Sequence, residues 1–270
     1  MNIPSPSSLS LCLLLILWGS SWVGCAHSGP AQQVALDSPP PLSPEREKEL
    51  LLLRKASRGN LEEVDRLLNA GVDINTQSDP GTTPLMSASF RGLVETVDFL
   101  LQKGARTDLT DASGSTALHY ATIQDHSSTL ARLIQADAAL EAKDENGFTA
   151  LMLVARFGSV ESLDLLLRAG AQVNAQDVHG WTPLFFALTR GSQELSLRLI
   201  EAGADVNHQS PLDGHSPLME AVTLGHKNLI QLLLRAGANP HLKDLQGKSP
   251  IDYAEEQGLP SSWLVLPGSK

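Results

Sequence analysis

Apolar and polar residues recur along the chain with a period of 33 residues. Each period starts with Gly, any residue, Thr or Ser, Pro or Ala, and Leu or Ile, and successive starts are separated by 33, 33, 33, 34 and 33 positions. The starting glycines are Gly81, Gly114, Gly147, Gly180, Gly214 and Gly247. A fixed period of this length indicates one small structural unit that is stacked repeatedly and buries its apolar side against its neighbours.

Each period predicts two helices joined by a tight turn. The Thr or Ser at its third place is expected to cap a first helix, and Pro is tolerated in the first turn. A small residue seven places after the glycine lets neighbouring helices approach closely, and paired apolar residues such as Leu166-Leu167 mark a second helix. Left-handed glycines are expected to end the first helix at Gly92, Gly158, Gly191, Gly225 and Gly258, and the second at Gly104, Gly170, Gly203 and Gly237.

The period is irregular at three places and incomplete at both ends. Asp125 and Asp137 stand where other units have Gly, so both are expected to have a positive φ, by sequence drift or at a weak joint. One extra residue in 210–214 predicts a tight turn that projects farther. Residues 51–75 form a partial unit behind a charged run, and after Gly258 a short apolar segment with Trp263 is expected to cover the last interface.

These units resemble the ankyrin repeat. Its G-x-T-P-L-H-x-A signature matches segments such as GTTPLMSA and GSTALHYA, and the resemblance extends from about residue 44 to residue 258. It implies an all-α ankyrin-repeat solenoid over residues 45–270, with helix-turn-helix repeats, β-hairpin fingers and five full repeats between incomplete capping units. It also implies a binding surface along one concave side, lined by the finger tips and the first helices.

The N-terminal segment has the composition of an export signal. Residues 11–18 form an unbroken apolar run, too short to span a membrane, which takes about 20 residues. Gly24-Cys25 resembles the lipobox of bacterial lipoproteins, which implies a signal peptide in 1–24, a lipid on Cys25, and an exported outer-membrane or periplasmic lipoprotein facing the periplasm. An ordinary secretory signal or an uncleaved anchor is the alternative. Residues 25–44 contain five Pro and are expected to form a Pro/Ser-rich tether.

Composition narrows the function. With 42% hydrophobic residues the 270-residue chain can build a core, which excludes wholesale disorder. A formal charge of −10 argues against a nucleic-acid partner, because phosphate binding needs a basic footprint. Both Cys lie in the N-terminal segment, at positions 12 and 25, so the repeats can form neither a disulfide nor a Cys-ligated zinc site.

The residues that could carry catalysis are better explained by a structural role within the repeats than by a catalytic one. His119 is in the place where, by the resemblance, ankyrin repeats carry a structural His that bonds between repeats. Four acids each precede a starting glycine by three residues, a place where Asp caps a turn: Asp111, Asp144, Asp177 and Asp244. The sequence has no catalytic motif or phosphate loop, so we expect a non-enzyme without cofactor or metal. A metal between His179 and His215 is the alternative.

The remaining candidate is a partner-binding surface on the concave side. Phe148, Phe157 and Trp181 fall in neighbouring repeats of a chain that is only 4% aromatic, and interface hot spots favour aromatic residues and Arg. The alternative is that these rings pack between fingers or over the first helix. The residues predicted to bind a protein partner are Phe90, Arg91, Phe148, Arg156, Phe157, His179, Trp181 and Arg190. The three arginines among them would tolerate an acidic partner.

The sequence therefore predicts a monomeric, non-catalytic protein-binding module, lipid-anchored at a bacterial cell envelope. An accessory, protective or inhibitory factor for one envelope enzyme is the second hypothesis. An enzyme built on a repeat scaffold is the third, and the lack of any polar constellation argues against it.

Overall fold

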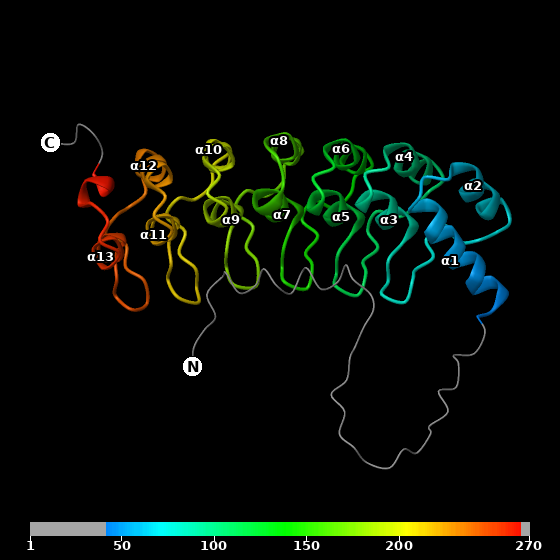
Figure 1. Cartoon of the computed structure of the whole chain (residues 1–270), viewed down its shortest axis with the longest axis horizontal. Helices are drawn as coiled ribbons and strands as arrows, with labels where there is room; N and C mark the ends of the chain where they lie inside the picture. The colour runs from blue at the N-terminus through cyan, green and yellow to red at the C-terminus, as the bar shows by residue number, and fades with distance from the viewer. Residues whose placement is uncertain (1–41, 266–270) are drawn as a thin grey trace, which may run out of the picture. The chain divides into compact units, whose positions relative to one another are not determined.

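A computed structural model describes residues 42–265, which form thirteen α-helices, one short 3₁₀ helix and no strand (Figure 1). The first helices of the units form one layer, the second helices form another, and the fingers extend beyond the first layer. The predicted all-α solenoid is confirmed. Its elements are α1 (Pro44–Ala56), α2 (Leu61–Asn69), α3 (Pro84–Phe90), α4 (Val94–Gln102), α5 (Ala117–Ile123), α6 (Ser127–Gln135), α7 (Ala150–Phe157), α8 (Val160–Arg168), α9 (Pro183–Thr189), α10 (Gln193–Glu201), α11 (Pro217–Thr223), α12 (Lys227–Arg235), α13 (Pro250–Glu256) and η3 (Ser261–Leu264).

Capping residues start the first helices as the sequence predicts. The Thr83 hydroxyl accepts a hydrogen bond from the Met86 N–H at 3.1 Å, and Ser216 does the same for the Met219 N–H at 3.3 Å. Pro occupies the first turn of α3, α9, α11 and α13, where its missing N–H costs nothing. The N-cap residues are Thr83, Thr116, Thr149, Thr182, Ser216 and Ser249, of which Thr182 makes no side-chain capping hydrogen bond.

The core is a continuous row of small and branched side chains that runs through all the units. The small residue in each first helix is at most 3% exposed, which lets helices of adjacent units pack closely. One Leu of each second helix packs against the first-helix layer, and shortening such a residue to Ala lowers the free energy of unfolding by about 2–5 kcal/mol. These leucines, all 0% exposed, are Leu100, Leu133, Leu166, Leu199 and Leu233.

Gly158 does not take the left-handed conformation predicted for it. Its φ of −86° and ψ of −171° are extended, whereas Gly92, Gly191, Gly225 and Gly258 all have positive φ. Helix α7 is one residue longer than α9, and residue 158 lies directly before the cap of α8. A Cβ at this position would lie 2.9 Å from the Val154 side chain, so glycine is needed for close approach.

Asp125 explains this departure. Its φ of 53° is positive as predicted, as is that of Asp137. Its carboxylate accepts hydrogen bonds from the Ser159 N–H at 2.9 Å and from the Ser162 hydroxyl at 2.6 Å, both at the start of α8. Asp125 thus fixes Ser159 at the start of the next unit, and Gly158, which directly precedes Ser159, has to adopt extended backbone to reach it. These bonds join the two units, which argues against a weak joint at Asp125.

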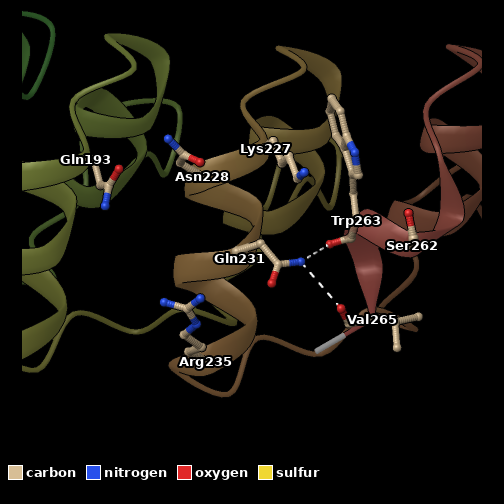
Figure 2. A pocket seen from close by; sticks show the side chains of 8 residues that line it. All are labelled: Gln193, Lys227, Asn228, Gln231, Arg235, Ser262, Trp263 and Val265. Carbon is tan, nitrogen blue, oxygen red and sulfur yellow. Dashed lines mark hydrogen bonds between the residues drawn. The ribbon is translucent and has the colours of Figure 1, made fainter. Parts of the chain in front are cut away.

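The ends of the array are closed by different elements. The first unit has both helices, α1 and α2, and Ser43 caps α1. At the other end η3 replaces a second helix, and the Trp263 carbonyl oxygen accepts a hydrogen bond from the Gln231 side chain at 2.6 Å (Figure 2). Trp263 therefore lies against α12 at the last interface, as predicted. The predicted signal peptide, lipidation at Cys25 and residues 25–41 of the tether fall outside the described residues.

Candidate partner-binding surface

Four aspartates shape the fingers. The Asp177 Oδ1 atom accepts hydrogen bonds from the His179 N–H at 2.9 Å and from the Trp181 N–H at 2.8 Å. Asp144 holds the Phe148 N–H in the same way at 2.8 Å, and Asp111 and Asp244 form equivalent turns. The predicted turn-capping role is confirmed. These capped turns fix the backbone of the fingertips next to the first helices. We call the surface formed by the fingers and the first helices the finger face.

Backbone hydrogen bonds connect one finger to the next. The Val178 N–H donates to the Asn146 carbonyl oxygen at 3.1 Å, and equivalent bonds join three other pairs of fingers. The inserted turn at 210–214 breaks this series because Pro211 has no N–H to donate. The Ser210 hydroxyl donates to the His179 carbonyl oxygen at 3.2 Å instead. The extra residue is therefore accommodated by a side-chain bond, and Leu212 of the same turn is 62% exposed.

His119 has the structural role that was predicted. Its Nδ1 accepts a hydrogen bond from the Thr116 N–H at 3.2 Å, so the proton is assigned to Nε2, which donates to the Phe148 carbonyl oxygen of the next repeat at 3.0 Å. Burial lowers the pKa of His119, which favours this neutral form.

Phe148 and Trp181 are half-buried and form part of a larger group of rings. Trp181 stacks on Phe185 at 4.5 Å, and Phe148 meets Phe186 edge-on at 5.2 Å. Phe185 and Phe186 are buried, so the rings pack between fingers and over α9, as the alternative interpretation had it for these two residues. Phe157 remains 42% exposed at the edge of the group.

Arg156 joins Phe148 and Phe157, and Phe186 connects Trp181 to the same group. Its guanidinium carbon lies 5.0 Å from the centre of the Phe157 ring and 5.9 Å from that of Phe148, and Phe186 is at 6.0 Å. Half-burial lowers the pKa of Arg156, and no carboxylate among residues 42–265 pairs with its guanidinium. This half-buried cation is thus held by rings alone. We call Phe148, Arg156, Phe157 and Trp181 the aromatic patch.

The other predicted binding residues are distributed around the aromatic patch. The His179 ring lies 5.6 Å from that of Trp181, and the Arg190 guanidinium donates to the Gly158 carbonyl oxygen. Phe90 belongs to a separate contact, since its ring meets that of Tyr120 at 5.9 Å. Arg91 is exposed at the end of α3. The structure thus brings Phe148, Arg156 and Phe157 together directly, and Phe186 connects Trp181 to them.

One acid on the finger face, Glu220 of α11, is not among the residues predicted from the sequence. Glu220 is only 5% exposed, and its carboxylate lies 3.5 Å from Nδ1 of His215 at the fingertip of the same repeat. Burial raises the pKa of Glu220 to about 7, with a further contribution from Asp213, and burial lowers the pKa of His215. A signal was available, because Glu is the only acid six places after a starting glycine.

The carboxylate of Asp177, close to the aromatic patch, has one oxygen without a hydrogen-bond partner. The Oδ2 atom of Asp177 is buried and has no hydrogen bond in the structure. Burial is also the main reason why the pKa of Asp177 is raised. In two other repeats the hydroxyl of a Tyr nine residues after the Asp donates a hydrogen bond to the Oδ2 atom of that Asp. Here Phe186 stands nine residues after Asp177 and has no hydroxyl.

A polar hollow lies between the second helices and η3 at the C-terminal end (Figure 2). Lys227 lies 5.8 Å from the centre of the Trp263 ring there. No group of three or more His, Cys, Asp and Glu in the described part of the chain could hold a metal ion. Within the same residues no helix is long and apolar enough to cross a membrane.

The chain belongs to the ankyrin-repeat family, whose domains are protein–protein interaction modules. A family model for ankyrin repeats in three copies matches residues 52–144, 124–210 and 198–266. The structure is similar to the ankyrin repeat domain of Bcl-3, described as a unique member of the IkappaB protein family, with a TM-score of 0.70, 32% identity and coverage of 75% of this chain and 92% of that one. The human ASB11 ankyrin repeat domain gives a TM-score of 0.65, 25% identity and coverage of 75% and 90%. No curated protein sequence gives a significant match.

Proposed function

We propose that this chain is a monomeric, non-catalytic module, held at a bacterial cell envelope by lipid on Cys25, that binds a protein partner through its finger face. The unpaired guanidinium of Arg156 among three aromatic rings carries the proposal. Such a group combines the residue types that dominate binding energy at interfaces with a charge that has no carboxylate partner within the described repeats. An acidic side chain of the partner is the group that would pair with it.

Two substitutions at the edge of the aromatic patch test partner binding with little risk to the fold. Arg156→Gln removes the charge, and Phe157→Ala removes a ring that is already 42% exposed. Arg168→Gln, in the same repeat but 79% exposed on α8, is the matched control. Full-length chains of all four types are used to capture proteins from membrane extract. We expect the wild type and the control to retain a common protein that the two patch variants lose.

The identity of that protein separates the two functional hypotheses. One stoichiometric envelope enzyme favours the accessory role, and several envelope components favour a scaffold. Equal capture by all four chains would contradict a role for the patch.

The lipid anchor has its own test. The Gly24-Cys25 pair after an apolar run supports lipidation, and several acyl chains on one residue give stable anchoring at about 0.8 kcal/mol per buried CH₂. Cys25→Ala should lose labelling by an acyl analogue and leave the membrane fraction, whereas Cys12→Ala should change neither. Unchanged labelling of the Cys25 variant would contradict lipidation.

A further inference from the structure

Glu220 is a buried carboxylate whose charge nothing in its surroundings balances. It is only 5% exposed, and its 3.5 Å approach to His215 is longer than a charge-assisted hydrogen bond, which is about 2.7–2.9 Å. Asp213 disfavours the ionised form of Glu220 further. An isolated buried carboxylate is costly unless a cation or hydrogen-bond donors reach it.

The nearby titratable groups do not supply that cation. Burial favours the neutral form of His215, and Asp244 is engaged by the Tyr253 hydroxyl at 2.7 Å. Lys248 pairs with Glu256 at 2.7 Å. The groups shown to act on Glu220 are therefore a neutral imidazole, that of His215, and a second acid, Asp213.

The His215 imidazole, which approaches Glu220 at 3.5 Å, belongs to a continuous series of rings. The His215 ring is 6.5 Å from Phe185 and 5.5 Å from Tyr253, and Phe185 stacks on Trp181 of the aromatic patch. A carboxylate at the end of the His215 contact, close to such a series of rings, suits a Lys or Arg side chain, since rings attract cations as the carboxylate does.

Building on the proposed function, we infer that the finger face receives an extended segment of the partner that carries two opposite charges, an acidic side chain at Arg156 and a basic side chain at Glu220. The two sites belong to α7 and α11, which both pack against α9. Helices in contact lie about 8–10 Å apart, so the two sites are separated by about 16–20 Å. An extended chain rises about 3.3 Å per residue, so the acid and the base should be about five or six residues apart.

Selection from random 12-residue peptides displayed on phage tests this inference on the full-length chain. We expect peptides selected on the wild type to carry an acid and a base at this spacing. Peptides selected on Glu220→Gln, which keeps the side-chain volume, should keep the acid and lose the base. Arg156→Gln should have the opposite effect, and Arg168→Gln should select the wild-type pattern.

A binding cycle then measures the pairing directly. Replacing the base of a selected peptide by Met should weaken binding to the wild type tenfold or more and leave binding to Glu220→Gln nearly unchanged. Peptides that depend on Arg156 but carry no base, or that lose the same affinity in both chains, would overturn the inference and leave the proposed function standing. Peptides that bind Arg156→Gln and Phe157→Ala as well as they bind the wild type, or a failure to enrich any peptide, would overturn both.

Discussion

Repeats of the finger face differ in how the finger is tied to its first helix. In the repeat that starts at Gly114, the Tyr120 hydroxyl donates to Oδ2 of Asp111 at 2.5 Å and closes the finger onto its first helix. The repeat that starts at Gly247 does the same with Tyr253 and Asp244. We call these the closed repeats.

The repeat that starts at Gly180, which we call the open repeat, lacks this bond. Its Asp177 keeps both turn-forming bonds through Oδ1, but Oδ2 is orphaned because Phe186 stands in the place of Tyr. The Phe186 ring instead contacts Phe148 and Trp181. The open repeat thus lacks a hydrogen bond at the place where the rings of the aromatic patch pack together, and such a local inconsistency is expected at a functional surface.

The largest effect should come from Trp181→Ala in the open repeat. Trp181 is half-buried and stacks on Phe185, so the substitution removes ring contacts and leaves a gap at the finger. We expect the free energy of unfolding to fall by about 3 kcal/mol, at the lower end for removal of large aromatic residues. Chemical denaturation of the wild type and the variant measures it. An unchanged free energy would show that Trp181 serves binding alone.

The second largest effect concerns Glu220, whose burial distinguishes the repeat that starts at Gly214. The folded pKa of about 7 lies above the ordinary value of 4.5, so the folded state binds a proton that the unfolded state has lost. Stability therefore falls as the pH rises from about 4.5 to 7. Between pH 5 and pH 8 the wild type should lose about 2 kcal/mol more than Glu220→Gln, since one pKa unit corresponds to about 1.4 kcal/mol.

Denaturation at both pH values tests this, with Glu161→Gln on the exposed side of α8 as the control that should follow the wild type. Neutralisation of His215 works in the opposite direction, because its lowered pKa adds stability as the pH rises. The expected difference is therefore given for the Glu220 variant against the wild type, since His215 is common to both. Identical pH dependence of the two chains would contradict burial of an unbalanced carboxylate.

Most of the fold could be predicted because its determinants are local. Caps such as Thr83 and turns such as that of Asp177 act within four residues, so a repeating sequence reveals them directly. Gly158 could not be predicted because its conformation depends on Asp125, which belongs to the preceding repeat. The same holds for the site: the sequence indicated the aromatic residues, but burial of Glu220 depends on which neighbouring side chains cover it.

The third largest effect should come from removing the Tyr–Asp hydrogen bond of a closed repeat. Tyr120→Phe keeps the ring but removes the hydroxyl that donates to Asp111. The carboxylate oxygen that accepts this bond then loses a partner in a partly buried place, and we expect a loss of about 1.5 kcal/mol in the free energy of unfolding. Thermal and denaturant unfolding would measure it, and Asp111→Asn should cost less when it is added to the Tyr120→Phe variant than when it is made in the wild type. Additive effects of the two substitutions would contradict a direct Tyr120–Asp111 bond.

The smallest effect should come from closing the open repeat. Phe186→Tyr places a hydroxyl nine residues after Asp177, the same separation that joins Tyr to Asp in both closed repeats. Because Phe186 is 3% exposed and the Asp177 Oδ2 atom is orphaned, the new hydroxyl should satisfy a buried acceptor and raise the free energy of unfolding by about 1 kcal/mol. Denaturant unfolding measures this gain, and Phe185→Tyr, in the adjacent position without such an acceptor, should give none. A loss of stability in Phe186→Tyr would show that the open repeat has a different geometry around Asp177, so that its missing bond could not be restored by a hydroxyl alone.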